Sequence, residues 1–321
     1  MNLAQASSGN INGRGARLLT LMLNLFPLLR FADFRIDTST YITDPGTDSY
    51  SGDSARAVND PIQANSQAPN PVSAGLKLYG REMKYDDLYK MDTKVAGAPS
   101  LFSKFADRKL SGLARVLGGE VASEMVAGNA TGNRMLGLKN FVLDAEAAGQ
   151  TTRLGFTAAQ LAGMNVQADM RLTISNEEDL RSFDELLRKE IKNVPGANGI
   201  LCNTSLAARL GSMAKKLGSA GESVDSFGKP VTTYDGRPII EVPDTALTLD
   251  ETDGVNEDCT SLIIVRFAEE EGVTFSTNSG FLFTDFPDDV VNPDEKARLQ
   301  FFLNLTVETL DSYRRVSRIR L

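Results

Sequence analysis

A run of apolar residues at helical spacing between residues 99 and 127 constrains this chain more than any other feature. Steps of three and four place one set of side chains on a single face of a 3.6-residue period. The set is Phe102, Ala106, Leu110, Leu113, Leu117, Val121 and Met125. Ser100 can cap the start and Gly128–Asn129 offers a left-handed end, so we expect a helix of roughly 40 Å. Such a helix spans a domain, and we expect residues 138–142 to enter a strand.

The chain of 321 residues contains no histidine and two cysteines, Cys202 and Cys259. Without histidine, the chain cannot form Ser–His–Asp or Cys–His catalytic groups or a zinc site with imidazole ligands. The two cysteines are too far apart in sequence to form a Cys-x-x-Cys zinc or redox motif. The formal net charge of −8 argues against general nucleic-acid affinity. Both ends are nevertheless locally basic, with Arg14, Arg17 and Arg30 near the first and four arginines after residue 313.

The first 75 residues fall into two segments. Residues 14–31 have the basic start and apolar run of a signal peptide, but no cleavage site follows and the run is too short to span a bilayer. We therefore expect an N-terminal arm or helix that docks on a partner surface, and secretion is the weaker alternative. Residues 37–75 are too polar to fold alone and are expected to run extended over a surface or to form a disordered linker.

From Leu76 to Tyr89, polar and apolar residues alternate, and Gly80 interrupts them as at a bulge. We expect a projecting pair of strands whose charges bind another molecule, with a solvated hairpin as an equal alternative. The candidate contact residues are Lys77, Arg81, Glu82, Lys84, Asp86 and Asp87, together with the basic Arg14, Arg17 and Arg30.

The middle third alternates expected helices and strands. Ser175 and Glu178 form a capping box that begins a helix closed by Pro195, and a second helix ends at a small, polar linker, 218–227. Asp235–Gly236 between two β-prone runs predicts a hairpin. The late alternation over 300–307 predicts a long strand, the natural sheet partner of the long helix.

Acidic residues near the end of the chain permit another class of function. Asp285, Asp288 and Asp289 suit a divalent ion in a soluble α/β enzyme. Acidic residues grouped in one loop are more often a solvated face, and the acidic segment 250–258 does not match the EF-hand pattern. We expect no enzyme, no metal site and no cofactor.

The order of these features resembles the major capsid protein of tailed bacteriophages, whose Hong Kong 97-type fold is shared with encapsulins. The resemblance covers the chain from about residue 70. It rests on the charged hairpin, the long helix with its glycine-rich exit, the helix–strand–helix succession, and the run from Phe227 to Pro243. That family often has a glycine-proline-isoleucine strand there, whereas here Arg237 separates the glycine from the proline.

The resemblance implies an α+β fold in four parts. Residues 1–70 would be an N-terminal arm and 71–98 an extended hairpin loop, both reaching over neighbouring subunits. Residues 99–144 and 269–321 would form a peripheral domain with a spine helix and a β-sheet. Residues 145–268 would form an axial α/β domain around five- and six-fold axes.

The function implied is self-assembly. Pentamers and hexamers would close into an icosahedral shell around the double-stranded DNA of a tailed bacteriophage, in a virion assembled in the host cytoplasm. Scaffolding, portal and decoration proteins are the further partners of such shells, and no membrane is involved. An encapsulin-like nanocompartment with protein cargo is the alternative with the same fold.

Two details refine the resemblance. Gly118 and Gly119 each cost roughly 1 kcal/mol of stability inside a helix. We expect them to permit a bend of the spine helix, so that the same chain can occupy positions of different curvature in a shell. Lys77 and Lys84 lie where some relatives cross-link, but no activating acid marks them, so no cross-link is predicted.

Overall fold

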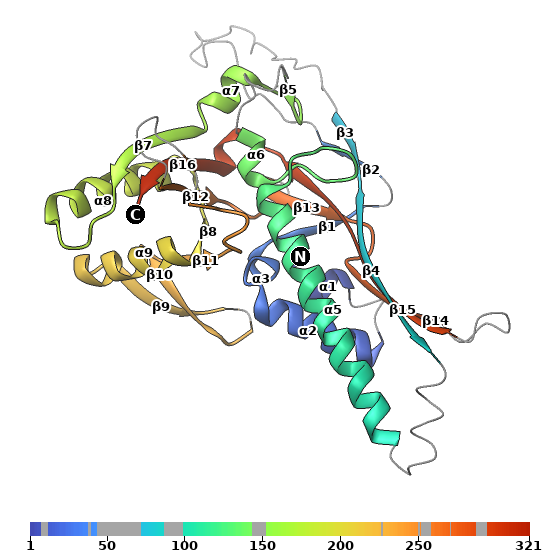
Figure 1. Cartoon of the computed structure of the whole chain (residues 1–321). Helices are drawn as coiled ribbons and strands as arrows, with labels where there is room; N and C mark the ends of the chain where they lie inside the picture. Colours follow the sequence, from blue (N-terminus) through green and yellow to red (C-terminus); the bar gives the residue numbers. More distant parts are fainter. Residues whose placement is uncertain are drawn as a thin grey trace, which may run out of the picture.

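In the computed structural model, the long helix α5 spans Pro99–Ala127, as the sequence predicts, and runs along one side of the molecule (Figure 1). The predicted apolar face is confirmed at Leu110, Leu117, Val121 and Met125, which are buried, and Leu113 is half-buried. The structure describes residues 1–7, 12–37, 40–43, 72–86, 99–142, 152–225, 227–249, 251, 258–269, 271–286 and 294–321. The side chains of residues 101–106 lie outside this description.

A five-stranded sheet packs on α5. Its strands are β1 (Phe34–Ile36), β4 (Lys77–Asp86), β13 (Val273–Thr277), β14 (Phe281–Phe286) and β15 (Asp294–Val307). The long strand β15 holds the sheet together, because β4 pairs with one of its edges and β13 and β14 pair with the other. The inward side chains of this sheet, Phe281 and Phe301 among them, share one core with α5. The predicted late strand and its packing against the long helix are thus confirmed.

A seven-stranded sheet forms the second half of the molecule. In spatial order its strands are β7 (Asn165–Arg171), β16 (Tyr313–Arg320), β12 (Cys259–Val265), β8 (Gly199–Cys202), β11 (Arg237–Glu241), β10 (Pro230–Tyr234) and β9 (Ala220–Val224). Helices α8 (Glu177–Lys192) and α9 (Thr204–Leu217) pack on one face, over Ile200 and Ile264. Leu201 and Ile263 point from the other face into the core shared with α5.

The remaining elements are short. They are α1 (Leu3–Ser7), α2 (Gly13–Leu25), α3 (Leu28–Phe31), the paired strands β2 (Thr40–Thr43) and β3 (Val72–Gly75), α6 (Leu138–Val142), β5 (Thr152–Arg153), β6 (Phe156–Thr157), α7 (Ala158–Ala162) and a 3-10 turn at Leu310–Ser312. Figure 1 shows α2 and α3 beside α5.

The start of the chain is not an arm. Leu3, Leu18, Met22 and Leu28 are at most 5% exposed and belong to the core that contains α5. The prediction that residues 14–31 dock on a partner is therefore wrong, because their apolar side chains pack in the core that contains the chain's own spine helix.

Several local predictions also need correction. Residues 138–142 form helix α6 and not a strand, and the predicted linker contains strand β9, whose side chains are all exposed. The cap of α8 is Asn176, one residue after the predicted Ser175. The hairpin at Asp235–Gly236 is confirmed, and both turn residues have positive φ, as a two-residue hairpin turn requires.

The C-terminal strand changes the expected division of the chain. Residues 269–321 were expected in the part with the spine helix, but β16 inserts between β7 and β12 of the seven-stranded sheet. Tyr313, at the start of β16, donates a hydrogen bond to the carbonyl of Leu138 at 2.8 Å, which fastens α6 to this sheet. The two sheets are therefore tied together by the last strand of the chain.

Gly118 and Gly119 allow the N-terminal segment around Met22 and Phe26 to pack closely against the spine helix. A Cβ atom at Gly118 would lie 2.8 Å from a ring carbon of Phe26 and 3.1 Å from Cε of Met22. At Gly119 the nearest ring carbon of Phe26 would be 3.3 Å away. The structure thus gives these glycines a packing reason that the sequence did not reveal, and their predicted role as a bend stays a prediction.

We expect Gly118→Ala to destabilise the chain and Gly112→Ala to stabilise it. Both positions gain about 1 kcal/mol of helix propensity, but the space at Gly112 is open, whereas at Gly118 the ring of Phe26 must move. Overpacking costs about 1–3 kcal/mol, so the two variants should differ by about 2 kcal/mol. Urea unfolding followed by circular dichroism measures this. Equal stability of the two variants would show that Phe26 does not constrain the helix.

Candidate assembly surfaces

The charged strand β4 does not fold back on itself in the described residues. It pairs antiparallel with β15 from Lys77 opposite Leu303 to Asp86 opposite Asp294, without a register shift at Gly80. The expected bulge is therefore wrong. The pairing satisfies the backbone groups of β4 that face β15, whereas the groups on its other edge have no strand partner among the described residues. Asp87 and the side chain of Asp86 lie outside the described residues.

Most of the charges expected to reach a neighbour have partners in the same chain. Arg81 bonds to Glu120 of α5, and Glu82 accepts two hydrogen bonds from Arg298 of β15, at 2.7 and 3.1 Å. Lys77 Nζ lies 3.4 Å from the carbonyl oxygen of Gly132. Since these pairs are exposed, they contribute little to stability and mainly orient the strand.

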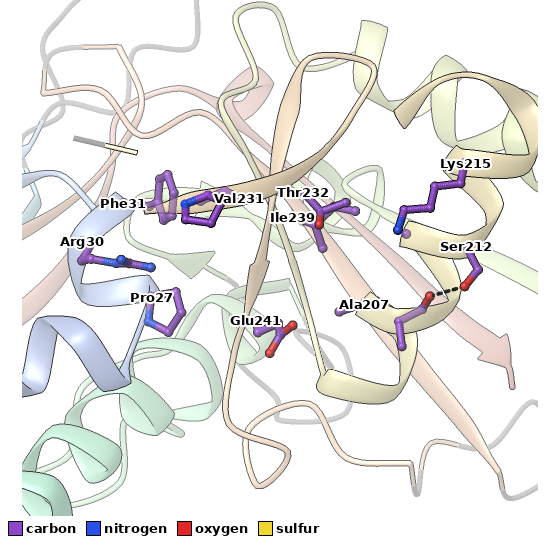
Figure 2. Close-up of a pocket in the computed structure, with 13 residues that line it drawn as sticks. Pro27, Arg30, Phe31, Ala207, Ser212, Lys215, Val231, Thr232, Ile239 and Glu241 are labelled. Carbon is purple, nitrogen blue, oxygen red and sulfur yellow. Dashed lines mark hydrogen bonds between the residues drawn. The ribbon is translucent and has the colours of Figure 1, made fainter. Parts of the chain in front are cut away.

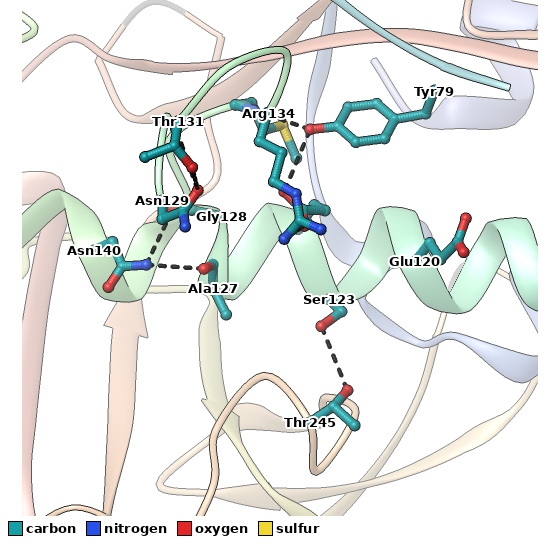
Figure 3. A network of polar contacts seen from close by, with 12 residues as sticks. Tyr79, Glu120, Ser123, Ala127, Gly128, Asn129, Thr131, Arg134, Asn140 and Thr245 are labelled. Carbon is teal, nitrogen blue, oxygen red and sulfur yellow. Dashed lines mark hydrogen bonds and ion pairs between the residues drawn. The ribbon is translucent and has the colours of Figure 1, made fainter.

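The exit of the spine helix is held by a polar network that includes β4 (Figure 3). The backbone N–H of Met135 donates to the Tyr79 hydroxyl at 2.9 Å, and Arg134 forms an ion pair with Glu124 at 3.1 Å. Burial, with Glu124 nearby, raises the pKa of Tyr79 to about 12. The Asn140 amide donates to the carbonyls at the end of α5. The exit loop therefore fixes β4 against the helix.

Gly128 within this exit does not have the predicted left-handed conformation, since its φ is not positive. It is needed for a close approach instead. A Cβ atom at Gly128 would lie 2.4 Å from the carbonyl oxygen of Met135. The same reason applies to Gly137, which donates a backbone hydrogen bond to Gly128 at 2.8 Å.

Arg30 lies inside the molecule and is therefore removed from the candidate surface. It is 8% exposed, and its Nη1 forms an ion pair with Asp225 Oδ2 at 2.6 Å. Asp225 Oδ1 also accepts hydrogen bonds from the backbone N–H groups of Phe227 and Lys229, both at 2.9 Å. The pair joins the N-terminal segment to the hairpin β9–β10 of the seven-stranded sheet.

A cleft of about 420 Å³ lies beside this pair. Figure 2 shows Pro27, Arg30 and Phe31 on one side and α9, with Ser212 and Lys215, on the other. Glu241 lines the same cleft. The cleft lies between the N-terminal segment and the seven-stranded sheet with α9. Because Asp225 already neutralises Arg30, this buried arginine is not available to bind a charged ligand.

The other two basic candidates are exposed. Arg14 lies 3.4 Å from Asp107 of α5 and 3.6 Å from Asp285 of β14. Arg17, one turn further on the same helix, is also exposed and lines a hollow of about 470 Å³ together with Asp107. Both stay predictions as contact residues, although Arg14 has acidic neighbours of its own.

A charge cluster that the sequence analysis missed joins the seven-stranded sheet to helix α6. Glu251 Oε1 accepts hydrogen bonds from Arg315 at 2.6 Å and from Ser261 at 3.0 Å, and lies 3.1 Å from Lys139 Nζ. Arg315 is 3% exposed. In the sequence, only the alternation of arginines with apolar residues near the C-terminus hints at this cluster. Its members lie far apart along the chain, so no local pattern shows that they pair.

The metal-site alternative gains no support from the described part of the chain. Among those residues, no group of three or more Cys, Asp or Glu side chains is placed to hold a metal ion. Asp285 lies beside Arg14, and Asp288 and Asp289 fall outside the described residues, as does most of the acidic segment 250–258. No helix in the described ranges has the length and apolarity needed to cross a membrane.

Comparison of the whole chain with known proteins gives matches in structure alone. No protein-family model and no curated protein matches the sequence. The fold is similar to the holo-SrpI encapsulin complex from Synechococcus elongatus PCC 7942, with a TM-score of 0.57 and 16% identity over 91% of this chain and 87% of that one.

Two further solved structures agree. The capsid of a native GTA particle matches with a TM-score of 0.54 and 12% identity, over 94% of this chain and 90% of that one. Mycobacterium phage Bobi matches with a TM-score of 0.50 and 12% identity, over 94% of this chain and 89% of that one. The three matches cover at least nine-tenths of this chain, and the chain therefore has the α+β capsid fold that the sequence resemblance implied.

Proposed function

We propose that this chain is the subunit of a closed protein shell and acts by assembly, not by catalysis. The observation that carries the proposal is the likeness to shell subunits over nine-tenths of this chain and a similar share of theirs. The chain also has the parts that such a subunit requires: two packed sheets tied by a spine helix, and a charged strand at the edge of one sheet.

The more specific proposal is the head of a tailed bacteriophage. Pentamers and hexamers would form an icosahedral shell around double-stranded DNA, with the seven-stranded sheet near the five- and six-fold axes. The virion would assemble in the host cytoplasm, with scaffolding, portal and decoration proteins as further partners. The net charge of −8 supports this, because a negative shell does not trap the DNA that it encloses.

An encapsulin-like nanocompartment is the second candidate, favoured by the likeness to the Synechococcus complex. The contents of purified particles separate the two candidates. Particles from the native source should retain DNA that nuclease cannot reach while the shell is intact. Particles that hold a protein cargo and no DNA would favour the nanocompartment, and a protein that forms no particles would contradict both.

A further inference from the structure

The sequence contains two Asn–Gly steps, Asn12–Gly13 and Asn198–Gly199. In such a step the backbone nitrogen of the glycine can attack the side-chain amide carbon of the asparagine, because glycine has no Cβ atom to hinder ring closure. Both asparagines are exposed, so exposure does not distinguish the two steps. The hydrogen bonds that hold each asparagine do distinguish them.

At Asn12 the three groups that would react are each available. Gly13 is the first residue of α2, and the first N–H groups of a helix have no partner within that helix. Oδ1 of Asn12 accepts a hydrogen bond from the backbone N–H of Gly15 at 2.9 Å, and such a donor stabilises the negative charge that develops on this oxygen during an attack on the amide carbon. Among the described residues, Nδ2 of Asn12, which would leave, has no hydrogen-bond partner.

The backbone at Asn12 can also turn into the reacting geometry at little cost. Asn12 lies just before the helix and has an extended backbone, with φ −80° and ψ 176°. Its carbonyl oxygen accepts a hydrogen bond from the N–H of Ala16 at 2.9 Å, so this first turn has to open before the nitrogen of Gly13 reaches the side chain. The ends of helices open with a free energy near zero. Around Gly13, no atom lies within 4 Å of the position that a Cβ atom would take.

Asn198 is held at both ends of its side-chain amide. Its Nδ2 donates to the carbonyl of Phe267 at 2.8 Å, and its Oδ1 accepts from the backbone N–H of Phe267, also at 2.8 Å. The backbone N–H of Asn198 donates to the carbonyl of Val265 at 3.0 Å. Gly199 is buried and begins β8, which lies between β12 and β11 in the seven-stranded sheet. Ring closure at Asn198 therefore requires that a central strand leaves its sheet, an opening that costs far more free energy than a frayed helix end.

We propose that Asn12 is a site of spontaneous deamidation in the folded chain and that Asn198 is not. The nitrogen of Gly13 forms a bond to Cγ of Asn12 and gives up its proton, and Nδ2 leaves with that proton as ammonia. Water then opens the resulting succinimide at either of its carbonyl carbons, which yields aspartate or isoaspartate at residue 12. The reaction needs no group other than water, and the proposal does not depend on assembly into a shell.

The two products act on α2 in opposite directions. Aspartate keeps the cap and adds a negative charge to a helix whose first turn contains no acidic residue, which favours the helix. Isoaspartate routes the main chain through the former side chain, so the side-chain cap is lost. Leu18 and Met22 of α2 lie in the core that contains the spine helix, so the loss of the cap weakens a segment that packs in this core.

Mass spectrometry of the full-length chain tests the proposal. After incubation in mildly alkaline buffer, the peptide that contains Asn12 should gain the mass of an amide-to-carboxylate conversion, and fragmentation should place the change at this residue. The peptide that contains Asn198 should stay unchanged in the same sample. In concentrated urea, where neither step is held by the fold, the two asparagines should react at similar rates.

Two variants give matched controls. Gly13→Ala should slow the reaction by about tenfold or more, because the new Cβ atom hinders ring closure, and the space around this position is open. Asn12→Ser keeps a good helix cap but has no amide to lose. The incubated wild-type chain should develop a fraction with a lower thermal midpoint, and the incubated Asn12→Ser chain should not.

Two results would overturn the proposal. One is a folded chain in which Asn12 keeps its amide over a time in which the chain in urea loses it. The other is equal reaction of Asn12 and Asn198 in the folded chain, since the hydrogen bonds of Asn198 would then give no protection.

Discussion

Replacing Arg30 with methionine should lower the free energy of unfolding by about 3 kcal/mol. The change leaves the carboxylate of Asp225, whose side chain is 1% exposed, without its counter-ion. Removing one partner of a buried ion pair costs about 3–5 kcal/mol, and the two backbone hydrogen bonds that Asp225 keeps favour the lower end of that range. Chemical denaturation of the full chain measures the loss.

The control for this prediction is Arg17→Met, on the exposed side of the neighbouring helix α2. An exposed substitution should stay within about 0.5 kcal/mol of the wild-type chain. The double variant Arg30→Met with Asp225→Asn should lose less than the sum of its two single changes, because no charge is then buried alone. Additive losses would mean that Arg30 acts through packing and not through Asp225.

The second large effect is expected at Glu251. Glu251→Gln should cost about 3 kcal/mol or more, because it removes the carboxylate that Arg315 and Lys139 share, their one ion-pair partner among the described residues. Arg315→Met should lower the free energy of unfolding by less, because Glu251 then keeps its ion pair with Lys139 and is not left without a counter-ion. Unfolding curves of the two variants test this order. A larger loss for Arg315→Met would show that the packing of the arginine outweighs the charge cluster.

Elements with a local pattern could be predicted from the sequence. The spine helix follows from its apolar period, the hairpin at Asp235–Gly236 from its turn residues, and β12 from an apolar run that is buried on both faces. Each of these signals lies within the element itself and does not depend on a distant partner.

The missed features depend on residues that are distant in sequence. Strand β9 is an exposed edge strand, so no alternation marks it. Strand β16 is rich in arginine, and Arg315 is tolerated in the interior only because Glu251 lies beside it. The apolar side of α2 predicts docking, but sequence alone does not distinguish the chain's own spine helix from a neighbour's surface.

The candidate contact residues show the same limit. Residue type and order pointed to β4, but the structure pairs Arg81 and Glu82 within the chain and buries Arg30. The strand register also places Lys84 directly opposite Lys296, which residue type and order did not indicate.

The central claim is that many copies of this chain close into a shell. Cryo-electron microscopy of the purified full-length protein tests it most directly, over a range of salt concentration and pH. We predict closed particles with five-fold vertices, into which the two sheets and the spine helix fit as one subunit. Monomers or small oligomers under every condition would contradict the account.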